Sequence, residues 1–181
     1  MLLTAGLLTL AGCGGSVADI PGIPPAPYSG PPKASTGTCT AVSCDCHDRA
    51  SCTSDCGDAV PCAIDCHQSK SSCALSCRDR CTADCHQSGS CAVNCGANCT
   101  LDCHQMTGTC TAKVGPQSNV DCHESGGCLI QCTGPCNVNC NGSASCKVVC
   151  ASADGCVVTC KATPTLCPDG KTKVCGSASC S

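Results

Sequence analysis

The sequence has no tryptophan and no phenylalanine, and Tyr28 is its single tyrosine. Aromatic side chains bury the largest apolar areas in ordinary protein cores. Their absence excludes a conventional core of large side chains, so the fold must be stabilised in another way.

Positive charge is also scarce. The chain has 10 Lys and Arg against 13 Asp and Glu, and the basic residues form no run. Neutralising phosphates requires clustered cations, and stacking on bases requires aromatic rings. We therefore expect no nucleic-acid partner.

Cysteine, by contrast, is abundant, with 29 among 181 residues. A content this high is typical of either a disulfide scaffold or a metal–thiolate protein, and the redox state of the compartment decides between the two.

The N-terminal residues indicate the compartment. They read MLLTAGLLTLAGCGG, and this apolar run of about 12 residues is too short to span a bilayer. The run ends in Leu10-Ala11-Gly12-Cys13, which resembles the lipobox of bacterial lipoprotein signal peptides. The resemblance implies a signal peptide at 1–12, lipid on Cys13, and a membrane partner through that anchor. It also implies a location in the bacterial cell envelope, at the outer membrane or cell surface. The remaining 28 cysteines are even in number, as a closed disulfide framework requires.

Residues 13–38 are interpreted as a lipid-anchored linker. The stretch 21–32 holds six of the eleven prolines and no periodic apolar pattern, which predicts an extended, semi-rigid spacer.

A repeat follows from Cys39 onward. A full unit has two Cys-x-x-x-Cys segments joined by a short turn and followed by a longer turn, and we number its cysteines first to fourth. The units recur in steps of 18 to 21 residues, at Cys52, Cys73, Cys91, Cys110, Cys128, Cys146 and Cys167. Such a period is typical of a solenoid. We predict a solenoid over 39–167 and a cysteine-containing cap or tail over 168–181.

The middle residue of each segment distinguishes strand from helix. Cysteines four apart share a face in either geometry, but the residue between them shares that face only in a strand. Nine of ten such residues are apolar, among them Leu75, Val93 and Ile130. We therefore predict an all-β fold, a narrow disulfide-rich β-solenoid of 18 to 21 residues per coil with two short strands in each. A chain of small disulfide-linked hairpins is the alternative.

The cysteine positions also predict a pairing scheme. In a flattened coil the second and third cysteines flank the short turn, and the first and fourth meet at the opposite end, so each pair is expected to cross-link within its own coil. Val114 and Ser118 occupy the second and third positions of one coil, which removes one bridge and leaves Cys110 paired with Cys122. Disulfide-ribbed β-helices of small insect antifreeze proteins are similar in architecture only. The disulfide candidates are Cys73, Cys77, Cys81, Cys85, Cys91, Cys95, Cys99, Cys103, Cys110, Cys122, Cys128, Cys132, Cys136 and Cys140.

Pairing at the two ends of the repeat stays open. Strict pairing within coils leaves one thiol over at each end, in the sets that contain Cys44 and, in the tail, Cys175 and Cys180.

All five histidines lie in a repeated Asp-Cys-His motif around the fourth cysteine. Strand alternation directs the Cys inward and the Asp and His outward, so the Cys and His cannot act together as nucleophile and base. The sequence also has no phosphate loop and no acid pair. We therefore predict that the protein is not an enzyme.

The outward Asp and His side chains are expected to form columns spaced about 4.8 Å from coil to coil. Imidazoles that close are expected to be able to share a Zn, Cu or Ni ion, with carboxylates completing the shell. The candidate metal ligands are His47, His67, His86, His104, His123, Asp65, Asp84, Asp102 and Asp121. We favour a column without metal, in which protonated His eases the repulsion between stacked Asp residues, and the metal site is the alternative.

Together these patterns favour a non-enzymatic, lipid-anchored repeat protein, stabilised by disulfides and without a cofactor. Its role would be structural or adhesive, with an unidentified envelope partner. The alternative is a metal-binding or metal-sequestering protein that uses cysteine thiolates or the His and Asp columns.

Overall fold

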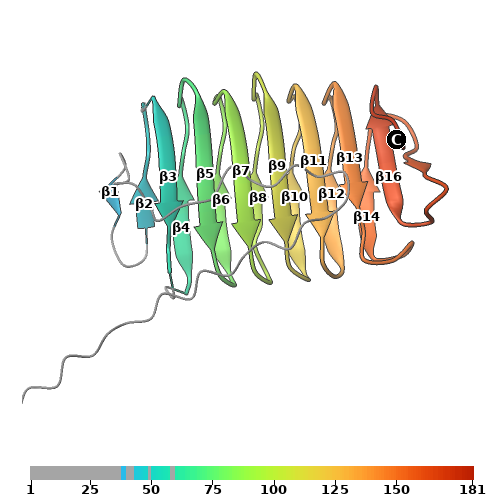
Figure 1. Ribbon diagram of the computed structural model, residues 1–181, viewed down its shortest axis with the longest axis horizontal. Helices are drawn as coiled ribbons and strands as arrows, with labels where there is room; N and C mark the ends of the chain where they lie inside the picture. The colour runs from blue at the N-terminus through green and yellow to red at the C-terminus, as the bar shows by residue number, and fades with distance from the viewer. Residues whose placement is uncertain (1–37, 40–42, 49, 58–59) are drawn as a thin grey trace, which may run out of the picture.

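The computed structural model describes residues 38–39, 43–48, 50–57 and 60–181, and every regular element in these ranges is a β-strand. The strands wind around a single long axis (Figure 1). The all-β prediction is therefore confirmed. The segment predicted as signal peptide, nearly all of the linker, and Cys13 lie outside the described residues.

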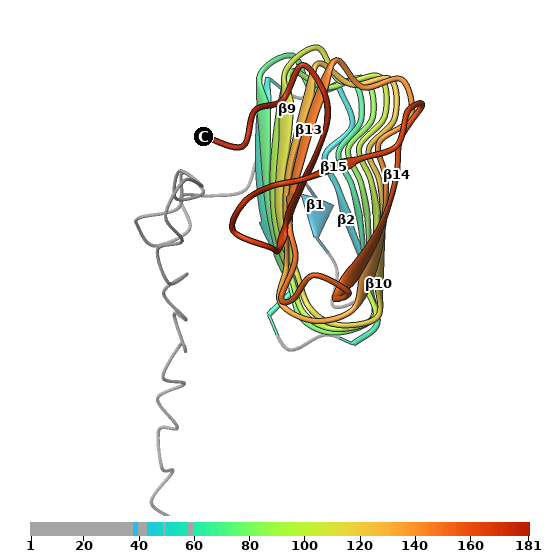
Figure 2. The ribbon, with the colours of Figure 1, turned by 90° about the vertical axis from the view of Figure 1, so that its right-hand side faces the viewer.

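Each coil contributes one strand to each of two facing sheets (Figure 2). Sheet A contains, in spatial order, β2 (Ser43–Asp45), β4 (Cys62–Asp65), β6 (Cys81–Asp84), β8 (Thr100–Asp102), β10 (Ser118–Asp121), β12 (Cys136–Asn139) and β14 (Cys156–Thr159). Sheet B contains β3 (Ser51–Asp55), β5 (Ser72–Cys77), β7 (Ser90–Cys95), β9 (Thr109–Val114), β11 (Gly127–Cys132) and β13 (Ser145–Val149). A short strand, β1 (Thr38–Cys39), pairs antiparallel with β2.

All neighbours from β2 to β14 are parallel and in register one repeat apart. In sheet B, for example, Cys73 pairs with Cys91, Cys91 with Cys110, and Cys110 with Cys128. Hairpins would have made the neighbours antiparallel, so the predicted β-solenoid is confirmed and the hairpin alternative is wrong.

The interior is built from cysteine and aliphatic side chains. The middle residues of the segments face inward as predicted, and Leu101, Ile130 and Val148 are at most 1 % exposed. Along the solenoid the bridged Cα atoms at the coil corners lie only 5.6–6.4 Å apart, whereas packed sheets normally lie about 10 Å apart. The corners of each coil are therefore narrower than the usual gap between two packed sheets.

The C-terminal end departs from the parallel order. β16 (Thr172–Gly176) pairs antiparallel with β13 and with β15 (Thr165–Leu166), and its residues Thr172 and Val174 are buried. The side chain of Lys173 donates a hydrogen bond from Nζ to the carbonyl of Cys156 in the last strand of sheet A, at 2.8 Å. A charged side chain at a strand edge discourages pairing with another chain.

The described ranges also contain no helix that is long and apolar enough to cross a membrane.

Candidate functional site

The cysteines form the covalent frame on which the site is built. All 27 cysteines with described side chains are disulfide-bonded, including the fourteen candidates identified from the sequence. The bridges lie at the two corners of each coil, where the short and the long turns reverse the chain. Figure 1 shows the long turns along the upper edge of the solenoid and the short turns along the lower edge.

At the short-turn corner the second and third cysteines of a coil pair, as predicted. The bridges are Cys56–Cys62, Cys77–Cys81, Cys95–Cys99, Cys132–Cys136 and Cys150–Cys156.

At the long-turn corner the prediction was wrong. The fourth cysteine pairs with the first cysteine of the next coil, in Cys46–Cys52, Cys66–Cys73, Cys85–Cys91, Cys103–Cys110, Cys122–Cys128 and Cys140–Cys146. The chain climbs by about one strand spacing, roughly 4.8 Å, per coil. This rise accumulates with the number of residues, and Cys85 lies 12 residues after Cys73 but only 6 residues before Cys91. Cys85 is therefore nearer in height to Cys91, and Cys110 and Cys122 pair with Cys103 and Cys128 rather than with each other.

The coil with two missing cysteines has an ordinary interior. Val114 and Ser118 stand in register with Cys95 and Cys136 of the neighbouring coils, and both side chains are completely buried. Ser118 Oγ accepts a hydrogen bond from the backbone N–H of Cys99 at 3.0 Å. A Val and a hydrogen-bonded Ser thus fill the space of one bridge, and no thiol is left unpaired there.

The ends of the repeat close by a change of pairing. Cys160 bonds to Cys175 and Cys167 to Cys180, which ties the last coil and β16 together. Cys44 is also disulfide-bonded. The three cysteines whose pairing was left open are therefore all oxidised.

The Asp-Cys-His motif shapes the long turn. In two of the five motifs the Asp carboxylate accepts the backbone N–H of the His two residues on, from His47 to Asp45 at 2.9 Å and from His86 to Asp84 at 3.2 Å. The residue after each His has a left-handed backbone, with φ of 52° to 56° at Asp48, Gln68, Gln87, Gln105 and Glu124. In these two motifs the Asp therefore serves as the side-chain cap of the turn.

Serine side chains hydrogen-bond this turn to the preceding coil. Ser88 Oγ donates to the carbonyl of Cys66 at 2.8 Å, and Ser69 Oγ donates to that of Cys46 at 3.4 Å. Ser125 and Ser143 make the same contact with Cys103 and Cys122. Sequence reasoning missed this contact, although Ser follows the motif at a fixed position in most units.

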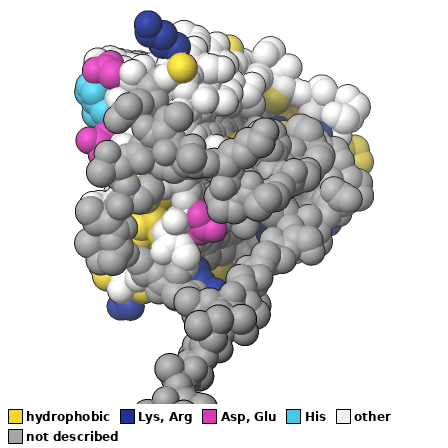
Figure 3. Space-filling model, turned by 60° about the vertical axis from the view of Figure 1, so that its left-hand side comes forward, with side chains coloured by type: hydrophobic (Ala, Val, Ile, Leu, Met, Phe, Trp, Pro, Cys, Tyr) yellow, Lys and Arg dark blue, Asp and Glu magenta, His cyan; other side chains and the backbone are white. Residues whose placement is uncertain are grey.

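In four of the five motifs the outward Asp contacts the ring of its own His. The Oδ1 to Nδ1 distance is 2.6 Å in Asp84–His86 and in Asp102–His104, and 2.7 Å in Asp121–His123; Asp65 and His67 make the same contact. The His side chains are 18–32 % exposed and the Asp side chains 38–48 %. Figure 3 shows histidine beside acidic side chains at the surface along one edge of the molecule.

Four of the five imidazoles stack in parallel. Ring centroids lie 4.9 Å apart from His67 to His86 and from His86 to His104, and 5.1 Å apart from His104 to His123, with interplanar angles of 4° to 7°. We call these four residues, each with its Asp, the histidine ladder. His47 lies outside it, because its ring is turned by 80° to that of His67 and its Nε2 contacts Asp48 at 2.8 Å.

The ladder does not chelate one metal ion between neighbouring rungs in this conformation. Metal–nitrogen bonds of about 2.0–2.1 Å place two nitrogens of one shell at most about 4.2 Å apart. Parallel rings 4.9–5.1 Å apart exceed that limit. Within the histidine ladder, the expectation that neighbouring imidazoles share an ion therefore does not fit the spacing of the rings. His47 and His67 lie closer, with ring centroids 3.7 Å apart.

Sulfur atoms come closer together than the imidazoles do. Within the described part of the chain, the groups of three metal-ligating atoms within 4.8 Å of one another contain only cysteines, for example Cys77, Cys81 and Cys95. Metal ligation requires thiolates, and these sulfurs are in disulfides. The oxidised protein therefore offers no thiolate site at these groups.

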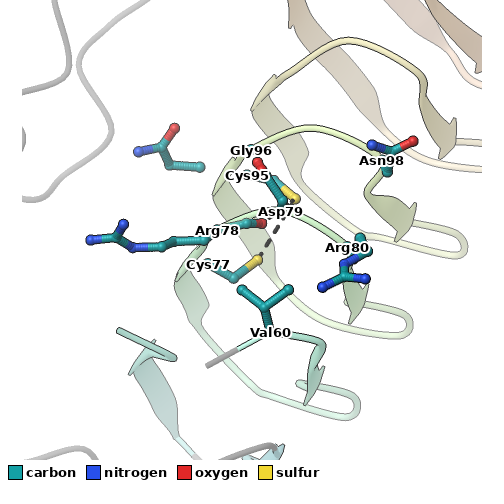
Figure 4. A pocket seen from close by; sticks show the side chains of 9 residues that line it. Val60, Cys77, Arg78, Asp79, Arg80, Cys95, Gly96 and Asn98 are labelled. Atoms are coloured by element: carbon teal, nitrogen blue, oxygen red, sulfur yellow. Dashed lines mark hydrogen bonds between the residues drawn. The ribbon is translucent and has the colours of Figure 1, made fainter. Parts of the chain in front are cut away.

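A shallow groove of about 870 Å³ lies at the short-turn corner (Figure 4). Its walls include Arg78, Asp79 and Arg80 of one turn and Gly96 and Asn98 of the next. Asp79 Oδ1 accepts the backbone N–H of Ala97 at 2.7 Å, which fixes the two turns together. The guanidinium groups of Arg78 and Arg80 point to opposite sides in Figure 4, so they do not converge on a common anion.

Comparison of the chain with protein-family models, with curated proteins and with solved structures finds no match.

Proposed function

We propose that this protein is a lipid-anchored, disulfide-braced rod of the bacterial cell surface with a structural or adhesive role and no enzymatic activity. The geometry supports this function best, because a stiff stack of coils presents repeated polar side chains along its length. Solenoids of this kind provide extended binding surfaces.

The single observation that carries the proposal is the oxidation of all 27 cysteines with described side chains, in a body whose interior otherwise holds aliphatic side chains and a few Ser and Thr. Bridges of this kind persist in oxidising compartments and are rare in the cytosol. This supports a location outside the cytoplasm, in agreement with the lipobox resemblance at Leu10–Cys13.

The count of cysteines adds support for lipid on Cys13. Intramolecular pairing of an odd set of 27 needs one further cysteine, and the chain has two outside that set, Cys13 and Cys39. One of these two is left over, as a lipid-carrying cysteine would be.

A non-enzymatic role is supported by the surroundings of the ladder. The cysteine between each Asp and His of the ladder is buried and oxidised, as at Cys85 and Cys103, so it cannot act as the nucleophile that the Asp–His pair would activate.

The test is to express the full chain in a bacterium with a lipoprotein-processing pathway and compare it with Cys13→Ala. We expect the chain to start at Cys13 by mass spectrometry, to carry the mass of acyl chains and to fractionate with membranes. The variant should lose the lipid and enter the soluble extracytoplasmic fraction. A chain that keeps residues 1–12 and remains in the cytoplasm, with titratable thiols, would refute the proposal.

A further inference from the structure

We propose that the histidine ladder is a metal-dependent docking surface for a second copy of this chain. Zn²⁺, Ni²⁺ or Cu²⁺ ions would sit between the Nε2 atoms of the two facing copies. The inference goes beyond the proposed function and does not depend on the lipid anchor.

The carboxylates prepare the rings for this role. In each rung Nδ1 lies against an Asp oxygen, at 2.6 Å in both Asp84–His86 and Asp102–His104. A neutral imidazole then keeps its proton on Nδ1, where the carboxylate accepts it, and Nε2 carries the lone pair. Within the described residues Nε2 of these two rings has no hydrogen-bond partner, so it is available as a ligand atom.

The spacing of the ladder makes the site incomplete in one chain. Because neighbouring rings are 4.9–5.1 Å apart and parallel, each Nε2 must bind its own ion. An ion held by a single imidazole keeps open positions that face away from the protein. A second ligand from outside the chain can occupy them.

A second copy matches these positions, because it has the same number of rungs at the same spacing. A two-fold axis across the ladder would place His67 opposite His123 of the second copy and His86 opposite His104 of the second copy. Such a contact uses the same patch on both copies and closes as a dimer.

The register of this contact is limited at both ends. His47 is turned out of the stack, and the unit after His123 has Asn141 where the others have His. Four rungs therefore face four rungs, and a shift by one coil would leave a rung without a partner.

Imidazole nitrogen selects the metal. Zn, Cu and Ni bind neutral His well, whereas Mg²⁺ and Ca²⁺ prefer oxygen ligands. Several weak two-His sites along one interface reinforce one another once the first has formed. Repulsion between dications about 5 Å apart opposes full occupancy, so we expect two to four ions per dimer.

The chain itself offers the matched variant. Asn139 and Asn141 form the same turn without Asp or His, and the backbone N–H of Asn141 donates to Asn139 Oδ1 at 3.1 Å. His86→Asn with His104→Asn should therefore fold and lose two rungs. Asp84→Asn with Asp102→Asn keeps the rings but removes the carboxylates that fix them. His47→Asn removes a histidine outside the ladder.

The experiment measures the mass of the purified full chain by sedimentation with Zn²⁺, Ni²⁺, Mg²⁺ or a chelator. We expect a doubled mass with Zn²⁺ and Ni²⁺, a monomer with Mg²⁺, and reversal by the chelator. The H86N/H104N variant should stay monomeric at the metal concentration that dimerises the wild type, D84N/D102N should need about 10- to 100-fold more metal, and H47N should behave as wild type. Circular dichroism of each variant reports that it has folded. A wild type that stays monomeric in Zn²⁺ and Ni²⁺, or a dimer that H86N/H104N leaves unchanged, would overturn the inference.

Discussion

The two corners of each coil are built on the same plan but differ in how closely their units resemble one another. Both are closed by a disulfide between the cysteines that flank the turn. The short turns at 78–80, 96–98, 115–117 and 133–135 share almost no residues, and one coil has lost its bridge. The long turns repeat Asp-Cys-His five times and place the outward side chains in a regular column.

This difference indicates which residues the reversal of the chain itself requires. The short turns diverged because several sequences can make the same reversal. At the long turn, the unit Asn139–Gly142 makes the reversal without Asp or His, with φ of 76° at Gly142. The fold of this turn therefore does not require a histidine.

The largest expected effect is unfolding when the disulfides at both corners are reduced. Each bridge across a loop this short contributes about 2 kcal/mol in the chain-entropy account. The thirteen bridges between described cysteines together exceed the roughly 5–15 kcal/mol of a typical domain. We expect reductant to abolish the β-sheet circular dichroism, while a chelator alone leaves it unchanged. A spectrum that survives full reduction, with thiols verified by titration, would show that the small-residue core is sufficient.

A smaller change restores the bridge that one short corner lacks. In Val114→Cys with Ser118→Cys the new cysteines stand in register with Cys95 and Cys136, which are bridged in their own coils. We expect the disulfide to form and to add about 2 kcal/mol, less about 1 kcal/mol for the lost Ser118 hydrogen bond. The chemical denaturation midpoint should rise accordingly.

The control for this pair is Val114→Cys alone. It should give one titratable thiol and no gain in stability. If the double variant also shows two free thiols, then the corner at Val114 has relaxed away from the geometry of its neighbours.

Much of the fold could be predicted because the spacing of the cysteines and the position of the apolar residues between them both indicate a strand. The Cys-x-x-x-Cys spacing fixes two inward positions, and an apolar residue such as Leu75 or Val93 between them admits only a strand. Constant segments with variable turns then indicate stacked coils. The interior of the strands and the bridges of the short corner follow directly from this pattern.

The long-corner bridges could not be predicted in the same way, because they depend on height along the axis. Cys85 has two candidate partners, Cys73 and Cys91. The choice between them depends on how far each part of the coil rises along the solenoid axis. The number of residues between the cysteines gives that rise only once the coil geometry is known. The ladder was predicted as columns, but its consequence for metal binding depends on a difference of less than 1 Å between the observed ring spacing and the limit for chelation. No residue pattern carries that difference.

A still smaller effect is expected when the Asp and His of one long turn are both replaced. Asp84→Asn with His86→Asn copies the Asn139–Asn141 unit, and the lost pair is partly exposed, so we expect a change in unfolding free energy below about 1 kcal/mol. Gly108→Ala in the same corner is the positive control, because an added Cβ would lie 2.2 Å from the carbonyl oxygen of Gly89 and force the coils apart. If the Asn pair destabilises the protein as much as Gly108→Ala does, the Asp–His contact is a structural requirement after all.

The smallest expected effect concerns Asp169, which makes the turn-capping contact seen at Asp84 but without a histidine. Hydrogen bonds from the Thr172 hydroxyl and from the backbone N–H groups of Lys171 and Thr172 lower its pKa from 3.8 to about 2. A depressed pKa in the folded state means that the carboxylate stabilises the turn above pH 3.8 and loses that contribution as the pH falls through about 2. We expect the Thr172 amide resonance to titrate near pH 2 while the coils, held by their bridges, stay folded. Asp169→Asn should remove that titration, and a Thr172 amide that titrates near pH 4 instead would mean that the carboxylate receives no such hydrogen bonds in solution.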